Sequence, residues 1–400
     1  MAWKVQDIVS QRKEFVVLAL HEEANVRQLC RRFGITAKTA YKWIGRFRAE
    51  GQAGLADRSR RPRASPRRTG TALEAAALTL RDEHPAWGGR KIRRRLQDQG
   101  LPDVPAASTI TDILRRHGQI DLAEAAKRKA FERFEHAAPN DLWQMDFKGH
   151  FALEGGGRCH PLTVLDDHSR FAIGLRACTN ETTETVRRTL TDWFRLYGLP
   201  RRMLMDNGSP WGNDAACRWT PLTLWLARLG VGVAHGRPFH PQTQGKDERF
   251  HRTLQVEVLR YETFADLAHV QRRFDPWRQV YNCERPHEAL ALATPASRYQ
   301  PSPRVFPETL PPVQYGPGDT VRRVQDGGLL SYQGRLWRIA RAFRAQSVAL
   351  RPTAVEGELD VFFCAQRVGR IDLRRGEASV TSGDHEDLDE ERTRDLDGRR

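Results

Sequence analysis

The chain has 400 residues, of which 29% are charged, and its formal net charge is +15. This length exceeds what one ordinary hydrophobic core organises, so we expect roughly three to four domains. No run of 18 or more apolar residues occurs and the first residues lack a signal-peptide core, which argues against a membrane protein and predicts a cytoplasmic, nucleoid-associated one.

The excess of positive charge predicts a polyanionic partner, with double-stranded DNA as the first choice. The last 17 residues, 384–400, hold eight acids and four arginines, so the rest of the chain is more basic still. A soluble protein that is merely basic is the alternative. The six cysteines form no CxxC pair, so neither a disulfide framework nor a cysteine zinc site is indicated.

Residues 1–56 are predicted to form a helix-turn-helix DNA-binding domain. Asn25 is a suitable cap for one helix, Gly34 permits the tight turn that ends it, and Thr36 caps the next helix. A small helical packing module is the alternative. The Arg- and Pro-rich residues 57–70 are predicted to be a basic linker.

The second of these helices is predicted to read DNA. Its apolar positions at helical spacing are Ala40, Tyr41, Ile44 and Phe47. The residues predicted to contact bases and phosphates are Lys38, Thr39, Lys42 and Arg46.

Residues 71–120 are predicted to form a second helical DNA-binding module, with Thr71 and Ser108 as helix caps. Its helix from 90 to 96 is rich in basic residues, and phosphate contacts are predicted for Arg90, Lys91 and Arg94. An ordinary solvated basic face is the alternative. Residues 121–138 are predicted to be a helical connector.

Residues 139–300 show the patterns of a mixed sheet with helices on its faces. Strands are predicted at 142–152, 160–167, 171–178 and 202–205, with a further short apolar segment at 231–234. Helices are predicted at 181–197, near 222–229 and from the Gln/Gly break before Glu248. The first three strands follow one another and predict an antiparallel meander.

Three acids stand out in this region. Asp146 lies mid-strand among large apolar residues, where an unpaired carboxylate is costly. Asp206 ends the fourth strand, and Glu248 lies about one turn inside a helix. Taken singly, a buried Asp with a backbone partner, an Asp-Asn-Gly turn and a solvated Glu are the simpler interpretations.

If the first and fourth strands are neighbours, the two aspartates converge, and a helix packed across them can deliver Glu248. Three carboxylates held close repel one another unless cations neutralise them. Oxygen-only ligands suit Mg²⁺, with Mn²⁺ as a substitute. Two such ions, ~4 Å apart, would activate an attacking oxygen and stabilise the leaving oxygen of a phosphodiester.

The blocks WQMDFKGHF, LDDHSRF, MDNG and HPQTQGKDERFHRTL resemble those of bacterial insertion-sequence transposases with an integrase catalytic core, the IS481/IS3-like group. The stretch NCERPHEAL at 282–290, followed by Thr294-Pro295-Ala296, resembles that family's closing block. The resemblance runs from about residue 6 to about residue 300. It implies an RNase H-like fold and a catalytic, metal-binding triad of Asp146, Asp206 and Glu248 with two divalent ions.

This chain departs from the family pattern in one respect. Forty-one residues lie between Asp206 and Glu248, a longer interval than is typical of integrases, and we place the extra residues at 211–221. Supporting roles are predicted for Asn207 and Asp166. Lys246, Arg249 and Arg252 are predicted to hold DNA phosphates, with ordinary solvated charges as the alternative.

The C-terminal part is predicted to contain a Pro-rich linker at 301–318, a small β-barrel at 319–376 and an acidic disordered tail at 377–400. Alternating strands are expected at 329–332, 336–339, 347–350 and 359–363. The barrel could bind DNA or a second subunit.

These observations predict a metal-dependent polynucleotidyl transferase, a transposase that binds the terminal repeats of a mobile element. It would hydrolyse phosphodiesters at the element ends to give 3′-OH groups and join them to target DNA. Two ends need two active sites, so a homo-oligomer, dimer or tetramer, is expected on DNA. The competing interpretations are a transposase-derived DNA-binding regulator without catalysis and a plain metal-dependent nuclease.

Overall fold

The computed structural model of this chain describes residues 7–58, 68–120, 135–212, 219–236 and 245–380. The chain divides into two compact units, Met1–Arg68 and Thr69–Arg400, and each is described by itself. None of the described helices is both long and apolar enough to span a membrane.

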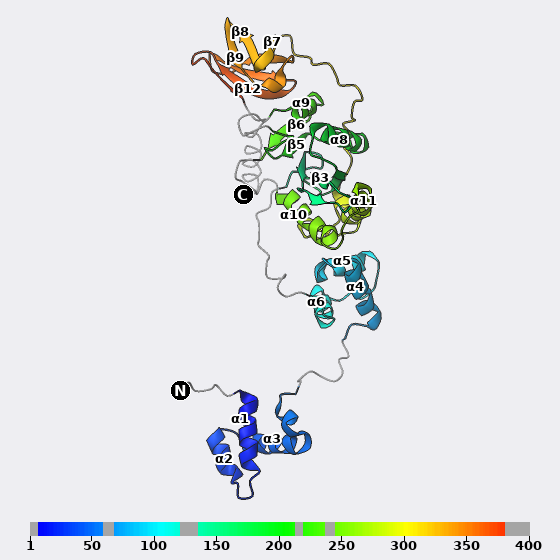
Figure 1. The fold of residues 1–400 in the computed structure, drawn as a ribbon, viewed down its shortest axis with the longest axis vertical. Coiled ribbons are helices and arrows are strands. Elements are labelled where there is room, and N and C mark those ends of the chain that lie inside the picture. The colour runs from blue at the N-terminus through cyan, green and yellow to red at the C-terminus, as the bar shows by residue number, and fades with distance from the viewer. Residues whose placement is uncertain (1–6, 59–67, 121–134, 213–218, 237–244, 381–400) are drawn as a thin grey trace. The chain divides into compact units, whose positions relative to one another are not determined.

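The first unit is a helix-turn-helix domain (Figure 1). Its elements are α1 (Ile8–Ala19), α2 (Val26–Phe33), α3 (Ala37–Glu50) and the 3-10 helix η1 (Gly51–Leu55). The side chain of Asn25 accepts a hydrogen bond from the Gln28 N–H, and that of Thr36 accepts one from the Thr39 N–H. Gly34 ends α2 with φ at 60°, so all three predicted turn residues are confirmed.

The apolar face of α3 differs from the prediction at one position. Tyr41 is 64% exposed, whereas Trp43 is buried with Ala40 and Ile44. Ala40, Trp43, Ile44 and Phe47 follow the three- and four-residue spacing of one helix face. Each residue turns the helix by about 100°, so the Tyr41 side chain, one position after Ala40, faces away from the core.

The second unit begins with three helices, α4 (Thr71–Glu83), α5 (Gly89–Asp98) and α6 (Ala107–Arg116). The predicted caps are wrong, because Thr71 lies inside the first turn of α4 and Ser108 inside that of α6. Gly70 and Ala106 take the cap positions without a side-chain hydrogen bond. Most of the predicted connector, residues 121–134, lies outside the described residues.

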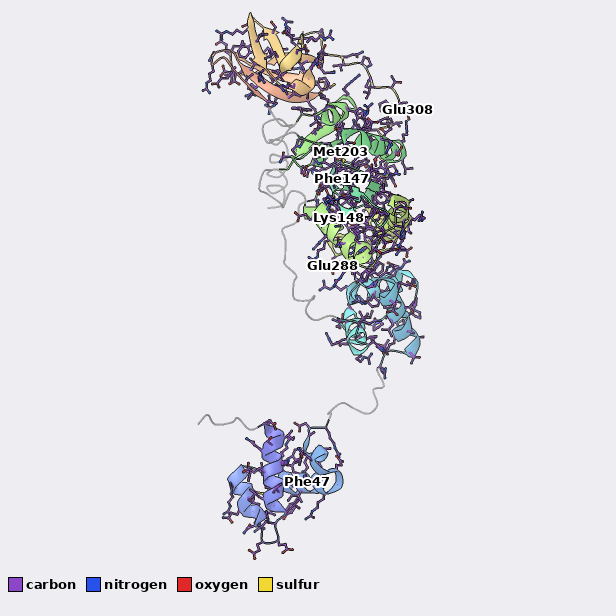
Figure 2. The ribbon with its side chains drawn as sticks, in the orientation of Figure 1. Phe47, Phe147, Lys148, Met203, Glu288 and Glu308 are labelled. Carbon is purple, nitrogen blue, oxygen red and sulfur yellow. The ribbon has the colours of Figure 1, made fainter. Side chains whose placement is uncertain are left out.

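A mixed sheet forms the centre of the second unit, and its strand and helix order is the predicted one except that the single strand predicted at 142–152 is divided into β1 and β2. The strands are β1 (Leu142–Phe147), β2 (Phe151–Ala152), β3 (Arg158–Asp166), β4 (Ala172–Cys178), β5 (Arg202–Met205) and β6 (Gly232–His235). β3 pairs antiparallel with β4, β1 and β2, while β1, β5 and β6 run parallel. Figure 2 labels Phe147 and Lys148 at the end of β1 and Met203 on β5.

Helices cover both faces of this sheet. The helices are α8 (Thr183–Tyr197), α9 (Pro221–Arg228), α10 (Gly245–Leu254), the π-helical turn η3 (Gln255–Leu259) and α11 (Leu267–Cys283), followed by the 3-10 turns η4 (Glu288–Leu290) and η5 (Pro295–Arg298). Trp143, Met145 and Met203 pack with α8 and α9 on one face. Leu165 and Leu175 pack with α10, η3 and α11 on the other.

The first residues of the segment predicted as a Pro-rich linker, 301–318, pack against the central sheet and its helices. The Ser302 N–H donates to the Tyr197 carbonyl at 2.8 Å, and the Leu199 N–H donates to the Arg304 carbonyl at 2.7 Å. Phe306 and Leu310 pack against the same apolar cluster as α8.

The C-terminal strands form an open sheet and a hairpin, so the prediction of a closed β-barrel is wrong in that respect. The elements are β7 (Thr320–Arg323), η6 (Asp326–Gly328), β8 (Leu329–Tyr332), β9 (Arg335–Arg338), η7 (Arg341–Phe343), β10 (Ser347–Pro352), β11 (Glu358–Phe363), β12 (Gln366–Asp372) and β13 (Glu377–Val380). The sheet order is β13-β12-β11-β10-β7, with β8 and β9 paired separately. Since β13 pairs with β12, the predicted tail cannot begin at 377, and its remainder, 381–400, lies outside the described residues.

Candidate active site

Asp146 lies on β1, and Asp206 directly follows the adjacent parallel strand β5. The register pairs Leu142 with Arg202 and Gln144 with Leu204, and its continuation by two positions puts Asp146 opposite Asp206. Adjacent strands are about 4.8 Å apart, and residues in register point to the same face of the sheet. The predicted neighbourhood of the first and fourth strands is therefore confirmed.

Burial and like charge perturb both carboxyl groups. Burial raises the pKa of Asp146 to about 7, and repulsion from Asp206, Glu181 and Glu248 adds to the rise. Burial also raises the pKa of Asp206, although a hydrogen bond from the Gly208 N–H at 2.9 Å opposes the rise. Such shifts indicate negative charges gathered at one place on the sheet.

Glu248 lies in the first turn of α10, the helix that covers the same face of the sheet. Its side chain is exposed, and the structure gives it no hydrogen bond to any described residue. Among the described residues, no three His, Cys, Asp or Glu side chains are arranged to hold a metal ion. The three acids thus interact electrostatically, but they do not form a ready-made ligand cluster.

His251 is a second polar residue that α10 brings to Asp146. Its Nδ1 lies 3.9 Å from Asp146 Oδ2, and its Nε2 lies 2.8 Å from the Thr163 hydroxyl oxygen. Burial and the charge of Lys148 lower the pKa of His251 to about 3, so the ring is neutral at pH 7. The helical spacing of His251 and Glu248 is visible in the sequence, but the approach of Thr163 is not.

Glu181 is a charged residue that the sequence reading missed. It lies between β4 and α8, contacts His160 Nδ1 at 2.8 Å, and raises the pKa of both Asp146 and Asp206. Nothing in its local sequence distinguishes it from a solvated loop acid, so only the fold reveals its place.

Lys246 has its ammonium group directed toward the protein interior. Its ammonium pairs with the buried carboxylate of Asp167, and its side chain is only 18% exposed. Burial lowers the pKa of Lys246 to about 8, and Asp167 opposes this effect. The prediction that Lys246 contacts a DNA phosphate stays a prediction, while Arg249 and Arg252 of the same helix are exposed.

The two predicted supporting residues have different surroundings. Asp166 accepts hydrogen bonds from the Asn140 N–H and from the Ser169 N–H, both at 2.7 Å, and from the Ser169 hydroxyl at 2.5 Å. It lies opposite Trp143, away from Asp146, so it holds the β3–β4 turn and not the site. The side-chain amide of Asn207 donates to the Gly236 carbonyl at 3.0 Å and thereby fixes the backbone that follows Asp206.

The residues predicted to contact DNA in the helical modules lie partly or fully on the surface. In α3, Lys38 and Lys42 are exposed, Thr39 and Arg46 are half-buried, and Lys42 and Arg46 lie over the Trp43 ring. In α5, Arg90 is exposed and Lys91 is half-buried, while Arg94 pairs with Asp98 at 2.8 Å. No contact with DNA is visible in a chain without nucleic acid, so these roles stay predictions.

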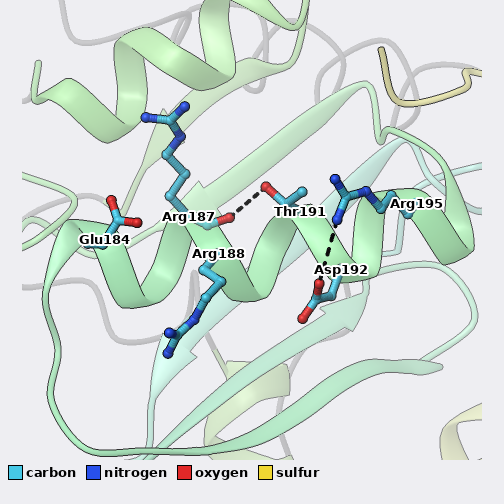
Figure 3. A pocket seen from close by; sticks show the side chains of 6 residues that line it. All are labelled: Glu184, Arg187, Arg188, Thr191, Asp192 and Arg195. Carbon is cyan, nitrogen blue, oxygen red and sulfur yellow. Dashed lines mark hydrogen bonds and ion pairs between the residues drawn. The ribbon is translucent and has the colours of Figure 1, made fainter. Parts of the chain in front are cut away.

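A shallow pocket lies on α8, and neither Asp146 nor Asp206 is among the residues that line it (Figure 3). It has a volume of about 310 Å³ and is lined by Glu184, Arg187, Arg188, Thr191, Asp192 and Arg195. The Thr191 hydroxyl donates to the Arg187 carbonyl at 2.9 Å, and Arg195 lies 4.0 Å from Asp192. These contacts lie within the helix itself.

Known protein families match the helical modules, the central sheet region and the C-terminal sheet of this chain. A helix-turn-helix domain matches residues 11–63 and a homeodomain-like domain matches residues 39–114. Integrase core domains match residues 136–241 and 229–295. The C-terminal domain of the IS481 family transposases matches residues 319–379.

Relatives of this chain are found in bacterial insertion elements. The chain is 28% identical over 243 residues to the "Insertion element IS407 uncharacterized 31.7 kDa protein" of Burkholderia multivorans, covering 58% of this chain and 82% of that protein. It is 29% identical over 232 residues to the "Insertion element IS476 uncharacterized 39.2 kDa protein" of Xanthomonas euvesicatoria, covering 56% of this chain and 64% of that protein.

Solved structures with some likeness include an intasome and an integrase domain. A simian T-cell lymphotropic virus intasome in complex with a PP2A regulatory subunit matches at 16% identity and a TM-score of 0.35, over 72% of this chain and 96% of the other. The HTLV-2 integrase catalytic core domain in complex with magnesium matches at 14% identity and a TM-score of 0.29, over 40% of this chain and 97% of the other.

Proposed function

Because the chain has the integrase core and the C-terminal domain of the IS481 family transposases, we propose that it cuts and joins DNA at the ends of a mobile element. In the first step, water hydrolyses a phosphodiester at each end and frees a 3′-OH. In the second step, that 3′-OH attacks a phosphodiester of the target DNA. Neither step needs a covalent bond between protein and DNA.

The observation that carries this proposal is the alignment of Asp146 with Asp206. Two carboxylates on adjacent strands, on one face and in one register, repel each other, and the raised pKa of Asp146 reflects that repulsion after the larger effect of burial. A fold gains no stability from this arrangement. We therefore attribute it to a function that brings cations to the two carboxylates.

Asp146, Asp206 and Glu248 suit Mg²⁺, with Mn²⁺ as a substitute, because all their ligand atoms are carboxylate oxygens. We propose that Glu248 completes the ligand set when the ions bind, since its exposed side chain is free to turn toward Asp146. Two bound ions would supply an activated oxygen nucleophile and charge stabilisation at the leaving oxygen.

The remaining residues of the site hold this set in place. The Thr163 hydroxyl donates to the Asp146 carbonyl at 2.9 Å, which fixes the backbone beneath the first carboxylate. The neutral His251 ring fills the space between Thr163 and Asp146 and adds no positive charge that would compete with a cation. Asn207 ties the backbone after Asp206 to Gly236.

We assign recognition of the element ends to the two helical modules. The residues proposed to contact DNA there are Lys38, Thr39, Lys42, Arg46, Arg90, Lys91 and Arg94, and on the core we add Arg249 and Arg252. Since an element has two ends, two active sites must act together, and we propose a homo-oligomer, dimer or tetramer, on DNA.

The test is strand transfer by the full chain with labelled element ends in Mg²⁺. We expect Asp206→Asn to reduce both cleavage and joining to the level of a reaction without protein, while binding of the ends persists. Asp192→Asn is the matched control, because Asp192 is exposed on α8 and takes no part in the site. If Asp206→Asn cleaves and joins like the parent, the catalytic assignment fails, and a parent that binds DNA but is inert with Mg²⁺ and Mn²⁺ would be a regulator.

A further inference from the structure

The ion pair between Lys246 and Asp167 lies two residues before Glu248, at the beginning of α10. The Asp167 side chain is only 1% exposed, so this pair is part of the protein interior. A buried ion pair is costly to assemble, and removing one partner leaves the other charge uncompensated. Its position next to the proposed catalytic acid therefore requires an explanation.

Asp167 is fixed to the sheet by several hydrogen bonds. Its Oδ1 accepts from the Gln144 side-chain amide at 2.7 Å, and its Oδ2 accepts from the His136 N–H at 2.9 Å. Its own N–H donates to the Leu142 carbonyl at 2.9 Å. The ammonium of Lys246 contacts the Asp167 carboxylate and also donates to the Asp167 carbonyl at 3.2 Å. The first turn of α10 is thus tied to a rigid point beside β1.

Lys246 is also the cation that faces two buried carboxylates. Asp247 is fully buried, and its carboxylate oxygens have no hydrogen-bond partner within the described part of the chain. Asp247 stands between Lys246 and Glu248 in the first turn of α10, so the ion pair and this buried side chain hold the same turn against the sheet. Arg170, which pairs with Glu135 at 3.2 Å, is a second cation that attracts the Asp167 carboxylate.

Glu248 depends on this anchor because its own side chain has no hydrogen bond to a described residue. Its position is set by the backbone of its turn, which Phe250 and Leu254 hold on one side through the apolar core. On the N-terminal side, among the described residues, the ion pair of Lys246 with Asp167 holds this turn in place. A ligand needs such support, since metal sites lose affinity when the groups that orient their ligands are removed.

We propose that the Lys246–Asp167 pair positions Glu248 over Asp146, and that Lys246 serves this purpose instead of contacting DNA phosphate. The inference rests on the proposed function, because it takes Glu248 as a metal ligand. Lys246 and Asp167 are positioning residues in this account, since neither touches the reacting atoms.

The test compares Lys246→Gln, Lys246→Arg and Asp167→Asn in the full chain, with Arg260→Gln, an exposed residue just after η3, as the control. Mn²⁺ affinity is measured by calorimetry without DNA, and affinity for the element ends is measured separately. We expect Lys246→Gln and Asp167→Asn to weaken Mn²⁺ binding about 10–100-fold. Binding of DNA and its KM should stay unchanged while kcat falls, and Lys246→Arg should restore part of the loss.

The double variant Lys246→Gln/Asp167→Asn should bind Mn²⁺ no more weakly than the weaker single variant, because both changes remove one interaction. Unchanged Mn²⁺ affinity in Lys246→Gln, with or without weaker DNA binding, overturns the inference. If that variant is too unstable to measure, Asp167→Asn, which adds no bulk, gives the decision by the same criterion.

The two proposals can fail separately. A parent chain that binds Mn²⁺ but does not join DNA contradicts the proposed function, while the comparison of Mn²⁺ affinities still decides the role of Lys246. A parent chain that binds no Mn²⁺ overturns the role of Lys246, and it overturns the proposed function as well when the chain also fails to cleave and join DNA with Mg²⁺ and Mn²⁺.

Discussion

At the scale of single residues, Asp146 shows how a site can oppose the stability of its own fold. Its pKa is raised to about 7 by burial first and by Asp206, Glu181 and Glu248 next, against an ordinary value of 3.8. Between these two values the unfolded chain releases the proton that the folded chain keeps. The contribution of Asp146 to the free energy of unfolding therefore falls as the pH rises from about 4 to about 7.

Asp146→Asn should stabilise the metal-free chain at pH 8, because the amide has no charge to be buried. We expect a gain of roughly 2–4 kcal/mol at pH 8, shrinking to nothing near pH 3. Thermal unfolding in the presence of a chelator, followed over this pH range, measures the difference. Asp192→Asn, which changes an exposed carboxylate, should track the parent, and equal stability of Asp146→Asn and the parent at pH 8 would contradict the burial of this charge.

At the scale of the helix, α3 distinguishes two aromatic residues that lie two positions apart. Trp43 is buried under the side chains of Arg12, Lys42 and Arg46, with the Arg12 guanidinium 3.9 Å from the ring centre, whereas Tyr41 is exposed. Trp43→Ala should destabilise the first unit by about 3–5 kcal/mol. Tyr41→Ala should change its stability by no more than about 0.5 kcal/mol.

Hydrogen exchange of the α1–α3 amides, measured in the full chain, compares the stabilities of the Trp43→Ala and Tyr41→Ala variants. It reports the stability of the first unit alone, because these amides belong only to that unit. A large loss of protection in Tyr41→Ala would show that the exposed position of this ring is wrong. Should Tyr41→Ala instead weaken binding of the element ends at unchanged protection, the ring would join the residues proposed to contact DNA.

At the scale of the strand, Gly174 of β4 permits close contact between the sheet and α8. A Cβ at this position would lie 2.1 Å from two ring atoms of Trp193, whose indole is held in the main apolar cluster. Gly174→Ala should therefore lower the stability of the second unit by about 1–3 kcal/mol, through displacement of the indole. Thermal unfolding measures the effect, and Gly318→Ala, which meets nothing within 4 Å, should leave the midpoint in place.

The elements that the sequence predicts well are those with an apolar period. β1, β4 and β5 are short, largely apolar runs bounded by turn residues, and α8 has apolar residues at helical spacing, so their existence and order were predictable. β7, β12 and β13 were not, because runs such as Thr320-Val321-Arg322-Arg323 are rich in charge and gain their pairing from distant strands. Asp146 and Asp206 belong to two recognisable strand patterns, so their approach was predictable from the sequence. The contact between Asp167 and Lys246 joins residues 79 positions apart, and no local pattern predicts it.

At the scale of the whole molecule, the predicted division into core and linker differs from the packing. Residues after 300 were expected to form a spacer because they are rich in proline, yet Arg304 is bound to the integrase core domain. Its guanidinium donates to the carbonyls of Pro200 at 2.5 Å, Gly230 at 2.7 Å and Leu229 at 3.3 Å. These carbonyls belong to the turns before β5 and after α9, so Arg304 joins two loops at one edge of the sheet.

Arg304→Ala should release this segment, since it leaves three carbonyl groups without their donor. We expect the second unit to lose about 1–3 kcal/mol. The Ser302 amide, which donates to the Tyr197 carbonyl, should exchange its hydrogen faster than in the parent, because the segment then leaves the apolar cluster that Phe306 shares with Phe194. Arg304→Lys, which keeps the charge but offers a single nitrogen, should give an intermediate exchange rate. Equal exchange of this amide in all three chains would mean that residues 301–318 act as the spacer that their composition suggests, and that the core ends where the sequence placed it.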